Sequence, residues 1–449
     1  MKVVFVTLFN ESARGTRQVA AAVQAAGHDV SFVHFKRFRS KAIPRENREE
    51  LEAAIARAPW QVREVTAAGE VFHPYHSPVT DRERRLFGEL VDRLKPDVVG
   101  FAPATHALPL AIELTDLVRE TRPGIPIAWG GIHPIVDPEE CLQSADVVCP
   151  GEGEEAFPEF LADPSRTDIA GLWFRSPAGP VKNPLRPLIQ DLDRLPWPIY
   201  GGDEYEIEDD RVERRMAEDA AFIRVNFYSE TSRGCPFACT YCIHSICHER
   251  YPGEKYLRNR SLENVIEEVK AFRRRFGGLQ AVMPFFDEIL LMNKKRFGRF
   301  AELYRREIGH PFTGFAHHKT TDREMLEIAR DAGIAEISIG LQTGSEWLAR
   351  EIYNRPIDRE KILQLARDID AVGAGRLIVN VLSDCAFERE KDLQATFDIL
   401  MEMPKPYLLQ LSRVVPFPKT VLAGMKCETP PIDVNTREFW NYLHLLTQT

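Results

Sequence analysis

Runs of apolar residues alternate with amphipathic helical stretches through most of the chain. In the first 160 residues, five apolar runs predict buried strands, and helical stretches such as Thr16–Ala26 separate them. Alternating strands and helices predict a parallel sheet with helices on both faces. The predicted strands are Lys2–Phe9, Asp29–Phe35, Asp97–Ala102, Ile125–Trp129 and Asp146–Cys149.

The same alternation returns from residue 222 onward. Helices are predicted at 262–275, from Thr321 to Gly333, and at 358–372. Strand–helix pairs of this kind predict a partial (β/α)6 barrel, whose functional residues lie at the carboxyl ends of the strands. The six predicted strands are Phe222–Tyr228, Leu279–Phe286, Phe312–His317, Glu336–Leu341, Arg376–Leu382 and Tyr407–Val415.

These patterns predict an α/β protein in which a doubly wound, Rossmann-like parallel sheet precedes the partial barrel. The first domain is expected at 1–164, with a largely helical, Arg- and Glu-rich insertion at about 36–90. Residues 165–221, with many prolines and an acidic stretch, are expected to form a linker. The barrel is expected at 222–425, followed by a short tail at 426–449.

Composition narrows the class of protein. A chain of 449 residues suits two or three domains. The net charge of -9, without a dense block of Lys or Arg, disfavours a nucleic-acid partner. No apolar run approaches the roughly 20 residues that span a bilayer, and Met1–Val6 lacks the features of a signal peptide. We therefore expect no membrane partner and a cytoplasmic location.

Three of the eight cysteines fall within a short segment, Arg233-Gly-Cys-Pro-Phe-Ala-Cys-Thr-Tyr-Cys242. Cysteine thiolates hold iron–sulfur clusters, and three ligands on a four-iron cluster leave one iron open to a substrate. Cys235, Cys239 and Cys242 are therefore candidate ligands of a 4Fe–4S cluster. The alternative is a zinc loop completed by a neighbouring side chain. Cys247, His244 and His248 are the neighbours near enough in sequence for that role.

The Cys-x3-Cys-x2-Cys spacing, with Tyr241 before the last cysteine, resembles the signature of the radical S-adenosylmethionine (SAM) superfamily. The resemblance implies that the open iron binds the amino and carboxylate groups of SAM. Electron transfer then cleaves the sulfonium to give a 5′-deoxyadenosyl radical. It also implies an electron donor such as flavodoxin or ferredoxin.

The resemblance extends over about 222–425 and implies further SAM-binding residues at the ends of strands. The turn at residues 383–388 departs from the Gly-Pro-Gly-Glu-Thr-like sequence of relatives, which weakens the assignment there. The competing interpretation for these polar residues is a helix cap or a solvated turn. The implied SAM-binding residues are Tyr241, Asp287, Gln342, Thr343, Ser345 and Asp384.

The first domain resembles the cobalamin-binding half of cobalamin-dependent radical SAM enzymes. Asn10-x-Ser12-x-x-Gly15 stands where relatives often carry Asp-x-His-x-x-Gly, and Gly130-Gly131 follows the fourth strand. A nucleotide-binding Rossmann unit is disfavoured because the first turn lacks Gly-x-Gly-x-x-Gly; a relic domain that binds nothing is a third possibility. The implied cobalamin-binding residues are Asn10, Ser12, Gly15, Ala104, Thr105, His106, Gly130, Gly131, His133, Gly151 and Gly153.

The usual cobalt-binding histidine of the motif is Ser12 in this chain. Because a hydroxyl is a poor cobalt ligand and imidazole a good one, we expect cobalamin to bind without a motif histidine. His106 and His133 lie on adjacent predicted loops and are candidates to approach the corrin. The alternative for each is an ordinary loop histidine.

The two resemblances together imply an enzyme that uses a 4Fe–4S cluster, SAM and cobalamin. The expected reaction is methyl transfer to an unactivated carbon, or phosphorus, of a small-molecule or biosynthetic substrate. Rearrangement, ring contraction or cyclisation with the same cofactors is the enzymatic alternative. A non-catalytic cobalamin- or redox-sensing protein is the alternative of another class.

Overall fold

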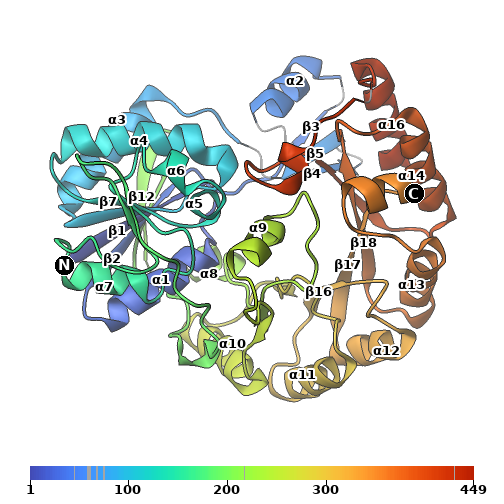
Figure 1. Ribbon diagram of the computed structural model, residues 1–449. Helices are drawn as coiled ribbons and strands as arrows, with labels where there is room; N and C mark the ends of the chain where they lie inside the picture. The colour runs from blue at the N-terminus through green and yellow to red at the C-terminus, as the bar shows by residue number, and fades with distance from the viewer. Residues whose placement is uncertain are drawn as a thin grey trace. The chain divides into compact units, whose positions relative to one another are not determined.

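The computed structural model describes residues 1–44, 46–57, 62–66, 69–73, 76–216, 218–428 and 430–448, and the chain forms two compact units (Figure 1). Unit 1 consists of Met1–Arg39, His76–Asn226 and Tyr251–Lys255, and unit 2 of Ser40–Tyr75, Phe227–Arg250 and Tyr256–Thr449. The chain therefore passes from unit 1 to unit 2 and back again more than once. Both units are α/β, which confirms the predicted fold class.

A single mixed sheet forms the centre of unit 1 within the described residues. Its nine strands run in the order β10-β9-β8-β7-β6-β1-β2-β11-β12, and β8, β7, β6, β1, β2 and β11 are parallel. The order reverses at β1, so the carboxyl ends of β1 and β6 flank a topological switch point, where open α/β sheets bind ligands. The strands are β1 Lys2–Leu8, β2 Asp29–Phe35, β6 Val98–Phe101, β7 Ile127–Trp129, β8 Val147–Val148, β9 Trp173–Phe174, β10 Val181–Lys182, β11 Asp203–Glu208 and β12 Arg211–Arg215.

Helices cover both faces of this sheet because its central strands bury both of their faces (Figure 1). Helices α3 and α4 contribute Phe87, Leu90 and Leu114 to the core on one face. Helices α1 and α7 contribute Val23 and Phe160 to the core on the other. The helices of unit 1 are α1 Arg14–Ala25, α3 Asp81–Leu94, α4 Leu108–Thr121, α5 Ile132–Val136, α6 Pro138–Cys141, α7 Ala156–Ala162 and α8 Ala220–Val225, with 3-10 turns η1 Thr105–Ala107 and η2 Leu192–Arg194.

The sheet of unit 2 combines a parallel half with an antiparallel half. Its described strands run in the order β15-β16-β17-β18-β19-β4-β5-β3, of which β15 to β19 are parallel. A separate pair, β13 and β14, lies beside the cysteine segment. The strands are β3 Lys41–Ile43, β4 Val62–Thr66, β5 Gly69–His73, β13 Ser232–Arg233, β14 Arg258–Asn259, β15 Met283–Pro284, β16 Phe312–Ala316, β17 Ile334–Gln342, β18 Arg376–Ser383 and β19 Leu408–Arg413.

Helices follow the parallel strands of unit 2 in sequence and pack one against the next along the outside of the sheet (Figure 1). Several begin at side-chain caps, as at Ser261, Asp322 and Asp358, and two end at glycines in the left-handed region. The helices of unit 2 are α2 Arg48–Arg57, α9 Ile243–Arg250, α10 Leu262–Arg275, α11 Lys294–Glu307, α12 Arg323–Ala332, α13 Arg359–Val372, α14 Glu390–Glu402, α15 Val421–Gly424 and α16 Val434–Leu446, with a π-helix, η3, at Leu348–Ile352.

Residues 165–221 do not behave as a linker, because they add strands β9 to β12 to both edges of the unit 1 sheet. On β11 the side chains of Glu204, Glu206 and Glu208 are buried. Each carboxylate pairs with a base, as Glu204 does with Arg17 at 2.8 Å. An acidic run normally indicates a solvated segment, so the burial of three paired carboxylates was not apparent from the sequence.

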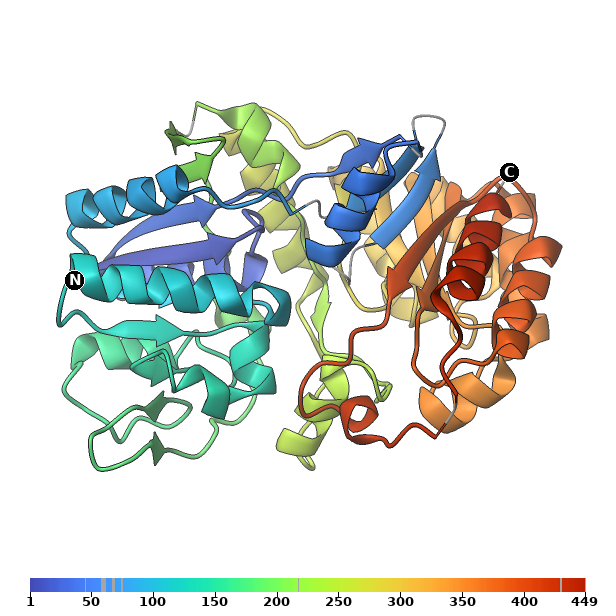
Figure 2. The same ribbon diagram turned by 90° about the horizontal axis from the view of Figure 1, so that it is seen from above.

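The predicted largely helical insertion at 36–90 is wrong for its central part. Besides helices α2 and α3, it contains β3, β4 and β5, which extend the unit 2 sheet past β19. Figure 2 shows these strands, in blue, beside the orange-red β19. Ile43, Phe72 and Ala54 form a small core of their own, which supplies the burial that the strands need.

Two further predictions differ from the structure. The predicted strand 222–228 contains the end of helix α8, and only Ser229 forms a parallel bridge, to Phe285. Val225 is 62% exposed, so this apolar run is not a buried strand. The tail at 426–449 contains α16, which packs against α14 and β19. No helix among the described residues is both long and apolar enough to cross a bilayer.

Candidate functional site

The three clustered cysteines lie on a loop of unit 2 between β13 and α9. The loop turns at Gly234, whose φ of +95° favours glycine. A Cβ on Gly234 would lie 2.4 Å from the carbonyl oxygen of Tyr256, which leaves no room for a side chain. The glycine before the first cysteine is therefore required by both conformation and space.

The segment that leads into this loop is held by a buried carboxylate. Asp287, at the end of β15, accepts hydrogen bonds from the Thr231 amide (2.8 Å), the Thr231 hydroxyl (2.7 Å) and the Ser232 hydroxyl (2.6 Å). Burial raises the pKa of Asp287, and these hydrogen bonds oppose that rise. The Thr231 carbonyl in turn accepts from Arg296 at 3.0 Å. Asp287 thus fixes the position of the segment that precedes the cysteine loop.

The next residue, Glu288, presents the exposed carboxylate at this strand end. It is about half exposed, and its Oε1 lies 3.0 Å from His244 Nε2. Its charge also contributes, after burial, to the raised pKa values of Cys235 and Cys242. Sequence reasoning selected Asp287 and missed Glu288, although the adjacent acids in Phe285-Phe286-Asp287-Glu288 were a visible signal.

The far side of the cysteine loop is held by the segment that follows β17. The Thr240 amide donates to Tyr353 O at 3.1 Å, and the Thr240 hydroxyl donates to Ile352 O at 2.5 Å. Asn354, in the left-handed region at φ +48°, donates from Nδ2 to Ala238 O at 3.2 Å. This segment ends the π-helix η3, and π-helical turns often occur at functional sites.

The three thiols suit an iron–sulfur cluster better than a single metal ion. Among the residues that the structure describes, no three His, Cys, Asp or Glu side chains are placed to hold one metal ion. In a cubane cluster each thiolate binds a different iron, so the thiols need not converge on one point. Burial raises the pKa of Cys235 to about 11 and that of Cys242 to about 12.

The neighbours that a zinc loop would require have other partners. His244 Nδ1 lies 2.7 Å from the Tyr256 hydroxyl, and its Nε2 faces Glu288. His248 Nε2 lies 2.9 Å from Cys235 O. Cys247 is buried in α9. These contacts leave Cys235, Cys239 and Cys242 as the candidate donors at this loop.

The implied SAM-binding residues near the end of β17 differ in how they are engaged. Ser345 donates to Asp392 Oδ1 at 2.6 Å, and Thr343 Oγ1 accepts from the Ser345 amide at 3.1 Å. Both side chains are buried and hold the turn against α14. Gln342 has a left-handed backbone (φ +64°) at an irregularity in β17. Its amide lies near the guanidinium of Arg355, beside Gly340.

Tyr241 and Asp384 lie in more enclosed surroundings. The Tyr241 ring packs edge-on against Tyr353 at 5.0 Å within a small apolar cluster. Asp384 accepts from the Ser383 hydroxyl at 2.8 Å and lies 3.6 Å from Arg437 of α16. The C-terminal helix therefore contacts the turn after β18, where a SAM-binding residue was predicted.

A pair of neighbouring histidines at the end of β16 was missed by the sequence reasoning. His317 stacks on Phe237 of the cysteine loop (4.7 Å between ring centres), and His318 stacks on His317 at 4.5 Å. Burial lowers the pKa of His317 to about 3 and that of His318 to about 4, so both are neutral at pH 7. A His-His doublet at the end of a predicted barrel strand was the available signal.

The predicted cobalamin-binding residues of unit 1 all follow the carboxyl ends of β1, β6, β7 and β8. After β1, Asn10 Oδ1 accepts from the Ala13 amide at 2.9 Å, ahead of α1. The Ser12 hydroxyl donates to Asn226 Oδ1 at 3.3 Å. No neighbouring atom would lie within 4 Å of a Cβ on Gly15. This part of the edge is therefore lined by small residues and has open space beside Gly15.

After β6 come Ala104, Thr105 and His106, and three aromatic rings meet there. Phe9 stacks on His76 with ring centres 3.8 Å apart, and the His106 ring lies 5.1 Å from that of His76. Burial lowers the pKa of His106 to about 4, so its imidazole is neutral at pH 7. His76 was not singled out from the sequence, because it lies beyond the strand pattern.

His133 is held between two neighbours after β7. Its Nδ1 lies 3.2 Å from Thr105 Oγ1 and its Nε2 lies 3.2 Å from Glu140 Oε2. Its side chain is fully buried. His133, which follows Gly130 and Gly131, thus has both ring nitrogens engaged within unit 1.

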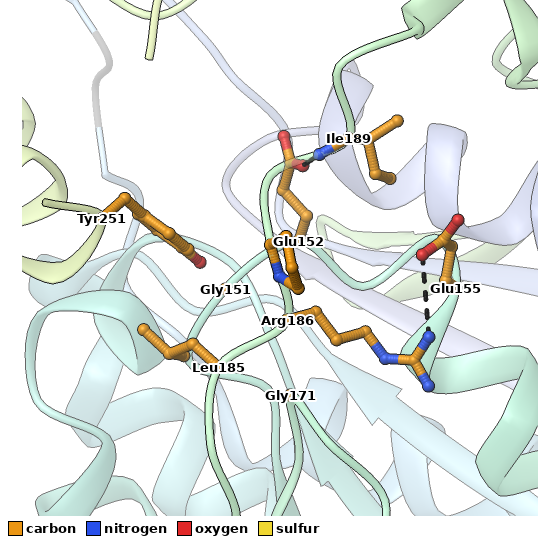
Figure 3. Close-up of a pocket in the computed structure, with 9 residues that line it drawn as sticks. Gly151, Glu152, Glu155, Gly171, Leu185, Arg186, Ile189 and Tyr251 are labelled. Atoms are coloured by element: carbon orange, nitrogen blue, oxygen red, sulfur yellow. Dashed lines mark hydrogen bonds and ion pairs between the residues drawn. The ribbon is translucent and has the colours of Figure 1, made fainter. Parts of the chain in front are cut away.

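After β8, Gly151 lies at the hydroxyl end of the Tyr251 side chain (Figure 3). The Tyr251 hydroxyl is 2.5 Å from the position of a Gly151 Cβ. The cavity beside them, between Leu185 and Glu152, has a volume of ≈ 10 Å³, room for about one water molecule. Gly153 lies close to Cys149 and Val19. This part of the edge is closed by the protein itself.

Two family models match the chain. The B12 binding domain matches residues 78–161, and the radical SAM superfamily matches residues 229–384. The first match lies in unit 1 and includes His106, Gly130 and Gly151. Apart from Tyr251–Lys255, the second lies in unit 2, and it spans the three cysteines and the start of the turn after β18.

Curated relatives share about a quarter of the residues. An uncharacterized methyltransferase of Pyrococcus horikoshii is 25% identical over 345 residues, 74% of this chain and 70% of the relative. The anaerobic magnesium-protoporphyrin IX monomethyl ester cyclase of Rubrivivax gelatinosus is 27% identical over 335 residues, 69% of this chain. The aligned region spans 56% of that cyclase.

Solved structures share the fold over nearly the whole chain. The radical SAM methyltransferase TsrM from Kitasatospora setae, with cobalamin and a [4Fe-4S] cluster bound, superposes with a TM-score of 0.66 at 15% identity. The similarity covers 94% of this chain and 76% of TsrM. The cobalamin-dependent enzyme OxsB matches 98% of this chain, and 55% of its own, with a TM-score of 0.61.

Proposed function

Because this chain belongs to the cobalamin-dependent radical SAM enzymes, we propose that it transfers a methyl group to an unactivated carbon or phosphorus of a small-molecule or biosynthetic substrate. The observation that carries the proposal is the joint presence, in one chain, of a B12 binding domain and an intact three-cysteine loop. When bound, the cluster supplies an electron for SAM cleavage and cobalamin supplies the methyl group.

The residues of unit 2 hold the cluster and its surroundings in place. Cys235, Cys239 and Cys242 are the thiolate ligands, and Gly234 allows the turn that presents them. Asp287 fixes the chain before the loop, and the carbonyls of Ile352 and Tyr353 fix its far side. The exposed Glu288 is the acid available to a positively charged amino group.

In unit 1 we propose that cobalamin binds along the carboxyl edge of β1, β6 and β7, next to the part after β8 that Tyr251 covers, without a histidine from the first turn. Ser12 stands in the motif position, and His133 already has partners for both ring nitrogens. His106, neutral and beside His76, is the remaining predicted imidazole at this edge. A small-molecule substrate and a low-potential electron donor, such as flavodoxin or ferredoxin, complete the proposal.

Cyclisation or rearrangement with the same cofactors is the second candidate. It is favoured by the 27% identity to the magnesium-protoporphyrin monomethyl ester cyclase of Rubrivivax gelatinosus. Methyltransferases are also among the relatives, including the cytidylyl-2-hydroxyethylphosphonate methyltransferase of Streptomyces wedmorensis, 25% identical over 352 residues. The two reactions differ in whether the methyl group of SAM reaches cobalt and product.

The test follows the methyl group with SAM that carries a deuterated methyl. Full-length protein with reconstituted cluster is incubated with a strong reductant, with and without cobalamin. Methyl transfer predicts cobalamin-dependent release of S-adenosylhomocysteine and recovery of the label in the corrinoid fraction. With a true substrate, it predicts equal amounts of S-adenosylhomocysteine and 5′-deoxyadenosine. Production of 5′-deoxyadenosine with no S-adenosylhomocysteine would instead support cyclisation or rearrangement.

A further inference from the structure

An arginine side chain lies against the cysteine loop. Arg355 Nη1 lies 4.0 Å from the Cys239 Sγ, at the limit for a hydrogen bond to sulfur. Its Nη2 donates to the carbonyl of Gly340, at the end of β17, at 3.1 Å. Two of its nitrogens therefore face fixed groups, one on the strand and one on the predicted cluster ligand.

The backbone next to Arg355 is tied to the same loop. The hydrogen bonds from Thr240 to Tyr353 O and from Asn354 to Ala238 O flank Cys239 on both sides. The left-handed conformation of Asn354 directs the chain into this position at some cost in strain. These contacts therefore hold the guanidinium at a fixed distance from the Cys239 sulfur.

Other side chains near the loop differ from Arg355 in charge. The Glu288 carboxylate lies 3.0 Å from His244 and carries the opposite charge. His317 stacks on Phe237 of the cysteine loop, and His318 stacks on His317. Arg355 is therefore the side chain that brings a permanent positive charge to the Cys239 sulfur.

We propose that Arg355 raises the reduction potential of the cluster that the cysteine loop binds. It is a positioning residue for electron transfer, because it acts through the Cys239 sulfur. Hydrogen bonds to cluster sulfurs and nearby charge are the means by which proteins set such potentials. A cation beside a cysteine sulfur stabilises the reduced cluster, which carries one more negative charge. One electron enters from the donor and leaves to the sulfonium of SAM, whose carbon–sulfur bond breaks. Arg355 itself is neither oxidised nor reduced.

The test is a redox titration of the reconstituted full-length protein, monitored by EPR of the reduced cluster, without SAM, cobalamin or substrate. Arg355→Met removes the charge and the donors but keeps a long side chain. We expect about a tenfold smaller equilibrium constant for reduction, a midpoint potential ~59 mV more negative for one electron. Arg355→Lys, which keeps the charge, should lie between Arg355→Met and the wild type.

The matched control is Arg350→Met, which removes an exposed arginine from the π-helix η3, just before Arg355 in sequence. We expect it to titrate like the wild type. A fully loaded Arg355→Met protein with the wild-type potential would overturn the proposal. So would an equal shift in Arg350→Met, because the effect would then be one of overall charge.

A second pair of variants covers the case in which Arg355→Met does not retain iron. Arg355→Gln also removes the charge but keeps a hydrogen-bonding group. Gly340→Ala keeps Arg355 but places a Cβ 2.6 Å from Gln342 Nε2 and 3.1 Å from Arg355 Nη2, so both side chains must shift. Both should show a potential below that of the wild type, and an unchanged potential in the loaded proteins would overturn the proposal. The measurement needs no methyl acceptor, so its result is independent of whether the enzyme methylates or cyclises.

Discussion

The cysteine loop of unit 2 and the carboxyl edge of the unit 1 sheet are both predicted cofactor sites, but they are built in different ways. The cysteine loop is held by specific groups on both sides, Asp287 before it and Ile352 to Arg355 after it. At the unit 1 edge, His133 and Gly151 contact neighbours within the unit, whereas Gly15 faces open space. A small inorganic cluster needs ligands at fixed positions. A large planar cofactor instead needs open space and small residues, which let the backbone approach it closely.

The largest effect is expected where the ligands themselves are removed. Replacing Cys235, Cys239 and Cys242 with Ala should abolish the EPR signal of the reduced cluster and the formation of 5′-deoxyadenosine, because no thiolate remains to hold iron. Cys427→Ala, at an exposed cysteine of the same unit, is the matched control and should keep both. Retention of iron and SAM cleavage by the triple variant would contradict the assignment.

The next effect tests the turn that presents the ligands. Gly234→Ala combines a left-handed backbone with a contact of 2.4 Å to Tyr256 O. We expect unfolding to become easier by about 1–3 kcal/mol, with lower iron content after reconstitution. Gly253→Ala has a similar φ of +79° but open space around its Cβ. A smaller loss of thermal stability in Gly253→Ala separates the clash from the backbone strain.

A pH-dependent effect is expected at the turn after β18. Burial raises the pKa of Glu388 to about 8, although Arg437 lies 2.8 Å away and opposes the rise. Between pH 4.5 and 8 the folded protein then holds a proton that the unfolded chain has lost. Stability from this group therefore falls as the pH rises through that range. Glu388→Gln should remove this dependence, seen as a smaller drop in melting temperature between pH 5 and pH 8.

The control for that measurement is Glu360→Gln, at an exposed glutamate on α13. It should reproduce the wild-type pH profile. If Glu388→Gln also reproduces the wild-type profile, the carboxyl group of Glu388 is ionised in the folded protein throughout this range.

The smallest effect is expected at the unit 1 edge. Protein loaded with cobalamin should show a Co(II) EPR spectrum without the nitrogen splitting of a lower axial imidazole, because a Ser12 hydroxyl is a poor cobalt ligand. His106→Phe should leave that spectrum unchanged. Nitrogen splitting that disappears in His106→Phe would identify His106 as the ligand, whereas splitting that persists would point to His76 or to the base of the cofactor.

The difference between the sites also explains what the sequence could predict. The spacing of Cys235, Cys239 and Cys242 is local, so the cluster loop was recognisable without any tertiary information. Strands such as Arg376–Ser383 were predicted well because they are continuous apolar runs buried on both faces. The role of Arg355 was not predictable, because its partner Cys239 lies 116 residues away in sequence.

Other failures have two physical causes, and the first is that the polar strands within residues 165–221 were interpreted as a linker. Glu204 carries a charge that sequence patterns assign to the surface, but it is buried because Arg17 forms an ion pair with it and His34 lies within hydrogen-bonding distance. Burial raises the pKa of the Glu204 carboxyl, but the charge of Arg17 and the hydrogen bonds from Arg17 and His34 lower it. The resulting pKa lies well below the usual range of a glutamate. Residues 41–73 were misjudged because their partner strand, β19, comes from the far end of the chain.

The pairing of β4 with β19 also constrains when the unit 2 sheet can assemble during synthesis. Glu64 and Gln410, which are hydrogen-bonded across these strands at 2.8 Å, are 346 residues apart. During synthesis on the ribosome, β3, β4 and β5 emerge early but must wait until β19 has been translated. At chain growth of about 5–20 residues per second, that wait lasts tens of seconds. In this interval one edge of β4 has no partner strand. Nascent chains are therefore expected to depend on chaperones more than the completed protein does.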